Sequence, residues 1–360
     1  MQSHGTAVIV GASLAGLMTA LTLARAGLKV TLLERSDDTG RTGAALHAPD
    51  GLIERITGLP SSQVPQSLTP GIQTWFAVHG ALRAAIEADP LIELRQNTAV
   101  RRVDQDAQHA WVDTTTGRRF TADLVVGADG HRSIVRRHVA PERPDATFAG
   151  YVIWIGIADE SAIAAKRWPR DTAFLGGYDD TLLGYPLPGV DGSTAPGDRR
   201  LGWAWYDASH NALLARSGAV QGSVVHHSLR PGDIPAATYR ELAQHARTAY
   251  PSPWREAILD SIERRAVIGT PIAEYVPDRL VTGRVALVGD AAHVPTPMTG
   301  SGFSESLHDA EALADALATE PAGTGVEAAL LDYEGVRLRS ARRLVQSGQG
   351  FSRSFATQAA

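Results

Sequence analysis

The sequence of 360 residues predicts an α/β protein that carries a β-rich insertion. First, residues 7–10 and 29–33 are short apolar runs on either side of a stretch rich in Ala and Leu. Such a strand, helix and strand within about 30 residues form a βαβ unit with parallel strands. Second, aromatic strands separated by Pro- and Gly-rich turns fill residues 151–206, which is typical of an antiparallel sheet. Third, the α/β pattern returns near residue 268.

Each expected element rests on a local pattern. The run 7–10 ends at a glycine and reads as a buried strand, and Gly27 stands where a C-cap would end the helix 14–26. Residues 35–74 hold clusters of Gly, Pro and Asp and are expected to be mostly loop. The remaining expected elements are helix 77–88, strands 98–104, 110–114 and 120–126 (the last an apolar parallel strand), strands 151–157, 181–187, 200–206 and 284–289, and helices 304–318 and 327–345.

The composition excludes several classes of function. A net charge of -5 argues against a surface for nucleic acid or anionic membrane. Cysteine is absent, which excludes a disulfide framework, a thiolate zinc site and a cysteine nucleophile. Residues 6–24 carry no charge, but spaced glycines and the following helix end favour a βαβ unit over a membrane span or signal peptide. We therefore expect a cytoplasmic protein with no metal site.

The first motif is Gly11-x-Ser13-x-x-Gly16, which joins the first strand to its helix. A helix N-terminus offers free N–H groups to a pyrophosphate; Gly11 allows the tight turn and Gly16 allows close packing. Serine replaces the middle glycine of the usual fingerprint and is still small. Glu34 ends the second strand, where it can accept hydrogen bonds from ribose hydroxyls and would repel a 2′-phosphate. This pattern predicts binding of FAD or NAD rather than NADP.

Two further motifs follow strands later in the chain. Residues 123–136 contain Gly-Ala-Asp129-Gly130 followed by a helix with a basic start, and residues 283–293 contain Gly289-Asp290-Ala-Ala-His. Asp290 ends a strand, where a carboxylate can bind ribityl hydroxyls of a flavin. Residues 300–302 open a helix whose N–H groups can face the pyrimidine edge of a flavin and stabilise negative charge on the reduced ring.

In this order, the three motifs resemble those of the class A flavoprotein aromatic hydroxylases, the p-hydroxybenzoate hydroxylase-like superfamily, over roughly residues 5–345. Residues 149–154, 184–189 and 289–297 resemble the 2,6-dihydroxypyridine 3-hydroxylase subgroup more narrowly. Many relatives carry an arginine in the helix after the first flavin loop, which residues 74–82 lack, and Gly300-Ser-Gly302 stands where Gly-Gln-Gly is usual. Because the sequence ends soon after the last expected helix, we do not expect the extra C-terminal domain of phenol hydroxylase-like members.

The resemblance implies a Rossmann-like FAD domain capped by an antiparallel-sheet substrate domain. The expected parts are residues 1–146 and 268–325 for the FAD domain, 147–267 for the substrate sheet and 326–360 for a C-terminal helix. The expected FAD-binding residues are Gly11, Ser13, Leu14, Ala15, Gly16, Glu34, Arg35, Arg41, Val103, Asp129, Gly130, Gly289, Asp290, Pro297, Gly300, Ser301 and Gly302.

The implied chemistry is monooxygenation. NADH or NADPH would reduce the FAD, O2 would form a C4a-hydroperoxyflavin, and one oxygen atom would enter an aromatic or heteroaromatic ring. Candidates for a catalytic role are Arg41, His47, Tyr185 and His226; candidates for substrate contact are Trp154, Trp203, Trp205 and Pro295. For His293 a local hydrogen-bonding role is favoured. Trp203 and Trp205 share one face of their strand, and one face of the sheet should cover the flavin pocket.

Other functions stay open at this point. A flavin-dependent epoxidase or Baeyer–Villiger-type oxygenase would use the same motifs, because they hold the cofactor and do not name the acceptor. A NAD-linked dehydrogenase and a non-catalytic dinucleotide-binding sensor are alternatives of a different class. The expected partners are a small ring substrate and O2, with no nucleic acid or membrane, and a homodimer is the default assembly.

Overall fold

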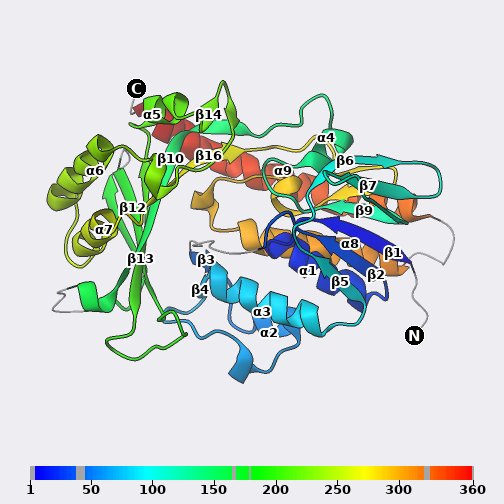
Figure 1. The fold of residues 1–360 in the computed structure, drawn as a ribbon, viewed down its shortest axis with the longest axis horizontal. Helices are drawn as coiled ribbons and strands as arrows, with labels where there is room; N and C mark the ends of the chain where they lie inside the picture. The colour runs from blue at the N-terminus through cyan, green and yellow to red at the C-terminus, as the bar shows by residue number, and fades with distance from the viewer. Residues whose placement is uncertain (1–4, 38–44, 164–167, 178–179, 320–324, 359–360) are drawn as a thin grey trace.

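The computed structural model describes residues 5–37, 45–163, 168–177, 180–319 and 325–358 (Figure 1). They form two large sheets, and the element order is α/β, then antiparallel β, then α/β again. The predicted fold class is therefore confirmed, and the antiparallel sheet lies at one end of the molecule, beside the layered α/β part.

The first sheet contains five parallel strands and one antiparallel edge strand. Its order is β17 (Val281–Thr282), β18 (Val285–Leu287), β9 (Leu124–Gly127), β1 (Thr6–Val10), β2 (Lys29–Leu33) and β5 (Ile92–Arg95). Helix α1 (Leu14–Arg25) connects β1 to its parallel neighbour β2, as the βαβ pattern predicts. The uncharged residues 6–24 are thus a buried strand and helix, and no described helix has the length and apolar character to cross a membrane.

Layers cover both sides of this parallel sheet. Helices α1, α3 (Trp75–Ala88) and α8 (Gly302–Thr319) pack together on one side. On the other side lie α4 (Ile134–Val139) and a small sheet of β6 (Val100–Gln105), β7 (Ala110–Thr114) and β8 (Arg119–Ala122). The single strand expected at 120–126 is split at Asp123, whose carboxylate accepts the Thr6 N–H at 2.7 Å. Strand β8 then pairs with β7, and β9 pairs with β1.

The segment 45–74, expected to be loop, contains short elements. They are β3 (Ala45–His47), α2 (Leu52–Thr57), the 3₁₀ turn η1 (Ser61–Gln63) and β4 (Ile72–Thr74). Strands β3 and β4 pair with each other and bring the chain back toward the second sheet.

The second sheet is antiparallel throughout. It contains β11 (Ala173–Gly177), β12 (Asp180–Leu187), β13 (Arg200–Asp207), β10 (Thr147–Asp159), β15 (Val224–Val225), β14 (Val220–Gln221) and β16 (Ile268–Glu274). Strand β16 pairs with β10, so the chain leaves this sheet after residue 274 and not at the expected boundary of 267.

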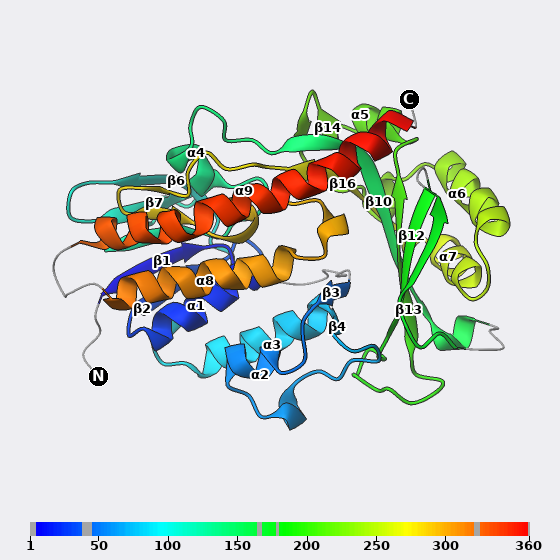
Figure 2. The same cartoon turned by 180° about the vertical axis from the view of Figure 1, so that it is seen from behind.

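Helices α6 (Ala236–Ala249) and α7 (Trp254–Glu263), together with short α5 (Asn211–Arg216), complete this sheet domain, and none of the three was predicted from the sequence. The last helix, α9 (Val326–Gln358), extends beyond the helix expected at 327–345 and lies within the C-terminal helix expected at 326–360. It runs from the α/β layers to the second sheet (Figure 2). It contacts both α8 and β10, and so ties the two parts together.

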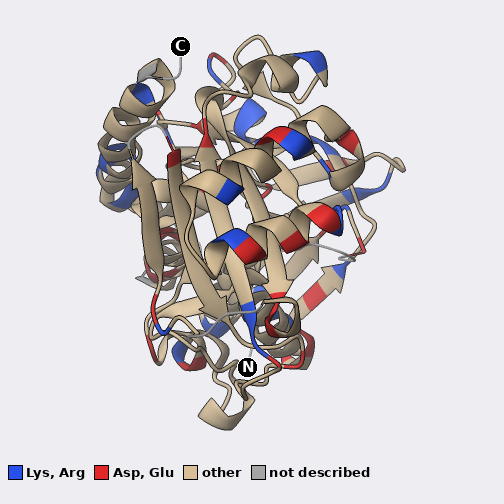
Figure 3. Cartoon of the chain, turned by 90° about the vertical axis from the view of Figure 1, so that its left-hand side faces the viewer, with Lys and Arg blue, Asp and Glu red and all other residues tan. Residues whose placement is uncertain are grey.

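The two faces of the second sheet differ in their aromatic residues. Trp154, Trp203 and Trp205 form the tryptophan face, whose buried cluster includes residues of α6 and α7. Tyr151, Tyr185 and Tyr206 form the tyrosine face, which packs with Ala45, Met298 and α9. Charged positions gather on helices and loops at this end of the molecule, and the strands themselves carry few (Figure 3). Because it packs with Ala45, Met298 and α9, the tyrosine face is the one directed at the α/β part.

Candidate functional site

Three turns meet where β1, β9 and β18 end, and we call them the cofactor edge: residues 11–16, 128–130 and 289–290. A Cβ on Gly11 would lie 2.5 Å from the Ala128 carbonyl oxygen, and one on Gly289 would lie 2.6 Å from the Ala15 Cβ. Only glycine permits these approaches, and both residues have positive φ angles, +100° and +58°. The carboxyl ends of neighbouring parallel strands are where dinucleotides bind in open α/β sheets.

The first turn presents unused N–H donors at the start of α1. Among the described residues, no hydrogen-bond acceptor contacts the backbone N–H groups of residues 13–16. A Cβ on Gly16 would lie 1.8 Å from the Gly11 carbonyl oxygen, so the turn closes tightly on the helix. Free N–H groups and the helix dipole together attract a pyrophosphate. The serine at position 13, where glycine is usual, does not disturb this geometry.

Glu34 is buried beside this turn. Its Oε2 accepts the Ala12 N–H at 2.9 Å, and its Oε1 accepts the Ser36 N–H and hydroxyl at 3.1 and 2.8 Å. The carboxylate thus stands at the end of β2, next to the dinucleotide turn, where an acidic residue binds a ribose hydroxyl in such folds. The exposed Arg35 follows directly, and Arg41 lies outside the described residues.

Asp129 in the second turn is engaged by its own helix. Its carboxylate accepts the Ile134 N–H at 2.6 Å and the Ser133 hydroxyl, and so caps α4. Burial raises the pKa of Asp129 despite these donors. Gly130 follows with a φ of +80°. The turn thus has a demonstrable structural role beside the FAD contact that the resemblance implies. Val103, another expected FAD contact, lies in the buried core on β6.

Arg136 connects the second and third turns. Its buried guanidinium donates to the carbonyl oxygens of Pro144, at 2.6 Å, and of Asp290 and Ala291, both at 3.1 Å. It also lies 4.2 Å from the Tyr275 ring centroid. Burial lowers the pKa of Arg136 from its usual value. This arginine stands within the second sequence motif, but its connecting role is visible only in the structure.

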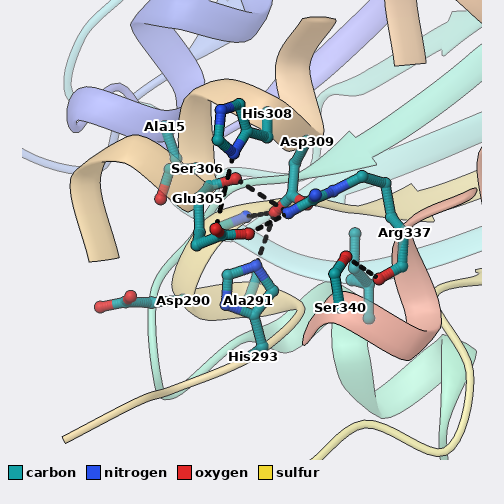
Figure 4. Close-up of polar contacts among 12 residues, drawn as sticks. Ala15, Asp290, Ala291, His293, Glu305, Ser306, His308, Asp309, Arg337 and Ser340 are labelled. Carbon is teal, nitrogen blue, oxygen red and sulfur yellow. Dashed lines mark hydrogen bonds and ion pairs between the residues drawn. The ribbon is translucent and has the colours of Figure 1, made fainter. Parts of the chain in front are cut away.

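A buried ionic network lies behind the third turn (Figure 4). Asp309 on α8 accepts the Gly289 N–H at 2.9 Å, His293 Nε2 at 2.7 Å and Arg337 Nε at 2.8 Å. Arg337, on α9, also donates to Glu305 Oε2 at 2.6 Å. Burial alone would raise the pKa of Asp309, but His293 and Arg337 hold it below its usual value. His293 thus has the local hydrogen-bonding role that the sequence favoured.

Asp290 differs from its neighbours in this network. Its side chain is exposed, points away from Asp309 in Figure 4, and has no hydrogen-bond partner among the described residues. The loop that follows includes the 3₁₀ turns η4 (Gly289–Ala291) and η5 (Pro297–Thr299), with Pro295 buried and Pro297 exposed. Gly300 has a φ of +63°, and α8 begins at Gly302. An available carboxylate and a helix start thus stand on one side of the cofactor edge.

The structure corrects the proposed role of the three tryptophans. Trp203 Nε1 donates to Ser261 Oγ on α7 at 3.1 Å, and the Trp205 ring lies 4.9 Å from the His245 ring on α6. Trp154 Nε1 donates to Asp207 at 2.7 Å on the same face. All three are core residues between sheet and helices. They face away from the cofactor edge, because the helices that were not predicted cover their side of the sheet.

The catalytic candidates lie in different places. Tyr185 is on the tyrosine face and buried, and its hydroxyl makes no hydrogen bond of normal geometry to a described residue. Burial raises the pKa of this hydroxyl, and the Ala45 backbone lies near enough to lower it slightly. His47 is exposed on β3, and His226 lies after β15, where its carbonyl accepts from Arg132. Arg41 lies outside the described residues. Of the three candidates that the structure describes, only Tyr185 lies on the sheet face directed at the α/β part.

Several residues near the site were not predicted from the sequence. Tyr151 hydrogen-bonds Thr296 at 2.5 Å, and Tyr206 stacks on Tyr151 with ring centroids 5.9 Å apart. Strand alternation could have grouped these tyrosines, but Asp309 and Arg337 join the third turn only through the packing of α8 and α9. The described residues contain no cluster of side chains suited to a metal ion.

Comparison with known proteins agrees with this geometry. The FAD binding domain family model matches residues 5–58 and 72–348. The 2,6-dihydroxypyridine 3-monooxygenase of Paenarthrobacter nicotinovorans is 30% identical over 85% of this chain and 81% of its own length. The 3-hydroxybenzoate 6-hydroxylase of Klebsiella oxytoca is 26% identical over 97% of this chain and 88% of its own.

Solved structures show the same fold. The 2,6-dihydroxypyridine-3-hydroxylase from Arthrobacter nicotinovorans superimposes with a TM-score of 0.81, at 20% identity, over 100% of this chain and 95% of that chain. A Klebsiella pneumoniae protein complexed with FAD and uric acid gives 0.73 at 20% identity, over 100% and 91%. The family match, together with the glycine turns, the free N–H groups and the available Asp290, shows that the chain belongs to the FAD-binding family of class A flavoprotein hydroxylases.

Proposed function

We propose that this FAD-dependent monooxygenase hydroxylates an electron-rich, preferably heteroaromatic ring that carries no carboxylate, with NADH or NADPH as the reductant. The observation that carries the proposal is the tyrosine face, which is directed at the FAD domain and offers uncharged groups. Family membership alone does not decide the substrate, because the motifs bind the cofactor.

The centre of this face is apolar apart from its phenols. Its members on four neighbouring strands are Tyr151, Ile153, Ile155, Ile157, Leu183, Tyr185, Ala204, Tyr206 and Ile272. The described charges on these strands lie toward the strand ends: Asp159 is paired across from Arg200. Arg200, at the end of β13, donates through Nε and Nη2 to the carbonyl oxygens of Pro188 and Gly189 at 2.9 and 3.2 Å. Among the described residues, a substrate carboxylate at the centre of this face would meet no cation, and burying an unpaired charge is costly.

Tyr185 supplies a neutral hydrogen-bonding group on this face. Its ring covers Gly202, where a Cβ would lie 2.1 Å from the ring, and burial raises the pKa of Tyr185 to about 12. The hydroxyl therefore stays protonated at neutral pH. A buried hydroxyl without a partner costs about 1–3 kcal/mol, so a ring hydroxyl, carbonyl or nitrogen that pairs with it is favoured.

The residues at the cofactor edge fit FAD. The N–H groups of residues 13–16 would bind the pyrophosphate, Glu34 a ribose, and Asp290 the ribityl chain, and the start of α8 would face the pyrimidine edge. Bound FAD supplies the redox chemistry that activates O2. The protein positions the ring, and its apolar sheet face excludes water.

The relatives differ in whether their substrate carries a carboxylate. The enzyme of Paenarthrobacter nicotinovorans, at 30% identity, is named for 2,6-dihydroxypyridine, a heteroaromatic ring without a carboxylate. The enzyme of Klebsiella oxytoca, at 26% identity, is named for 3-hydroxybenzoate, a ring with a carboxylate. The uncharged centre of the tyrosine face makes the first substrate class the better match.

Matched substrates test the proposal. We expect 2,6-dihydroxypyridine and resorcinol to stimulate NADH or NADPH consumption by the purified holoenzyme, with a product heavier by one oxygen atom. Salicylate and 3-hydroxybenzoate should stimulate it at least about tenfold less, as expected for an unpaired buried charge. Equal stimulation by the carboxylates would contradict the substrate class. A product whose mass and NMR spectrum show an epoxide or a ring-expanded lactone would favour the alternative oxygenases.

A further inference from the structure

Besides Glu34, a second buried side chain, that of His79, binds the dinucleotide turn. His79 on α3 is 5% exposed, and its Nε2 lies 3.2 Å from the Ala12 carbonyl oxygen. A carbonyl oxygen can only accept, so Nε2 must carry the proton in this contact. The two residues are 67 positions apart in the chain, so the bond joins α3 to the turn between β1 and α1.

Because the peptide group is planar, this contact also fixes the direction of the neighbouring N–H donor. In a trans peptide the C=O and N–H bonds point in opposite directions. Glu34 holds the Ala12 N–H, so the Gly11 carbonyl points the other way, toward Gly16. In the same manner, His79 holds the Ala12 carbonyl, so the Ser13 N–H points away from α3. Two successive peptide groups are thus each fixed by one buried polar side chain.

The Ser13 N–H is the first of the unused donors at the start of α1. Its direction decides whether it joins those of residues 14–16 in binding a pyrophosphate, because helix N-termini bind anions through several converging N–H groups. We infer that His79 is a positioning residue for FAD, acting through the Ala12–Ser13 peptide rather than through the flavin. This inference rests on the cofactor of the family and is independent of the proposed substrate.

The residues around His79 fix the position of its imidazole ring. Its ring stacks on Trp75, with centroids 4.5 Å apart and planes 16° from parallel. Thr74 caps α3 by accepting the Ala77 N–H at 3.1 Å, which fixes the turn of helix that carries Trp75 and His79. Residues 74–82 at the start of this helix lack the arginine seen in many relatives, and in that stretch His79 is the polar side chain that contacts the turn.

The test compares the affinity of the apoprotein for FAD and for ADP in variants of His79. His79→Leu removes the hydrogen bond, and the Kd values for FAD and ADP should rise by the same factor, about three- to tenfold. His79→Gln places an amide N–H near the position of Nε2 and should recover most of the affinity. The asparagine of His79→Asn is shorter and should not recover the affinity. If the Leu variant does not fold, the comparison of the Gln and Asn variants tests the inference on its own.

A matched control is His210→Gln in the sheet domain. His210 is a half-buried histidine bound to Asp207 at 2.5 Å, and its ring contacts Trp154 on the tryptophan side of the sheet. This variant should lower thermal stability without changing either Kd. The inference is overturned if the Leu variant binds FAD as tightly as wild type, if Gln and Asn are equally impaired, or if ADP affinity is unchanged while FAD affinity falls.

Discussion

The cofactor edge and the tyrosine face hold their ligands by different means. At the edge, backbone N–H groups and glycines form the surface, and buried charges behind them, such as Asp309 and Arg337, fix the backbone. On the tyrosine face, the side chains themselves form the surface, and the charges lie toward the ends of the strands. The first arrangement suits one invariant cofactor, and the second allows the substrate to change with a few side chains. Substitutions in each region test this difference between the cofactor edge and the tyrosine face.

The largest effect is expected at Asp309. Asp309→Asn removes the buried charge that pairs with His293 and Arg337, and losing one partner of a buried ion pair costs about 3–5 kcal/mol. The free energy of unfolding, from denaturant titration of the holoenzyme, should fall by that amount, and FAD should be lost more readily. Asp104→Asn is the control, because its partner Arg102 is exposed. Equal losses in both variants would remove the special role of the network.

Gly289 should matter more for FAD than for folding. Gly289→Ala brings a Cβ to 2.6 Å from the Ala15 Cβ at a φ of +58°, which strains the contact between the first and third turns. With about 1–3 kcal/mol of strain, FAD affinity should fall by about five- to 150-fold. Gly117→Ala also has a positive φ, +85°, but its Cβ would meet nothing within 4 Å. If both variants bind FAD equally well, the close approach of the turns is not required.

On the tyrosine face, Tyr185→Phe should act on substrate and spare the cofactor. Losing one neutral hydrogen bond of about 1 kcal/mol predicts a roughly fivefold rise in KM for the ring substrate, with an unchanged Kd for FAD. Trp203→Phe is the control on the opposite face, where the ring packs against α7. It should reduce stability and leave KM unchanged. A raised KM in Trp203→Phe with an unchanged KM in Tyr185→Phe would instead place the substrate on the tryptophan face.

The smallest effect is a pH dependence of stability in the sheet domain. Burial alone would lower the pKa of His210, but its bond to Asp207 raises it, and the same pair holds the pKa of Asp207 below its usual value. A raised histidine pKa stabilises the fold below about pH 6.5, and this stabilisation is lost as the pH rises through the folded-state value.

His210→Gln should therefore lower the Tm most between about pH 4 and 6.5, by about 2 °C for a loss near 1 kcal/mol. The difference from wild type should shrink at higher pH and also below the lowered pKa of Asp207. Melting curves of the two proteins across about pH 3–9 measure it. A constant difference across this range would show that the pair does not change its charge with folding.

The same two regions differ in how well the sequence predicted them. The βαβ unit, the three turns and Glu34 follow from patterns that are local in the chain, and the structure brings them together as expected. Alternation also grouped Trp203 with Trp205 correctly. It could not say which face of the sheet meets the FAD domain, because that depends on what covers the other face.

Helix α6 carried the signal that was missing from the prediction. Its buried residues Tyr239, Leu242, Ala243 and Ala246 follow the spacing of an amphipathic helix, which must bury that side against something. Had this helix been predicted, the tryptophans would have been its natural partners. The contacts of Asp309, Arg337 and His79 are of another kind: they join segments distant in sequence, and no local pattern indicates them.

The most direct test of ring hydroxylation at the tyrosine face follows the oxygen atom. Holoenzyme with NADH or NADPH and 2,6-dihydroxypyridine under ¹⁸O2 should give a hydroxylated product with one ¹⁸O atom per molecule, and the Tyr185→Phe variant should give less of it at low substrate concentration. Reduced-coenzyme oxidation that yields only hydrogen peroxide, across the whole panel of uncharged rings, would contradict the assignment of the tyrosine face as the site of ring hydroxylation.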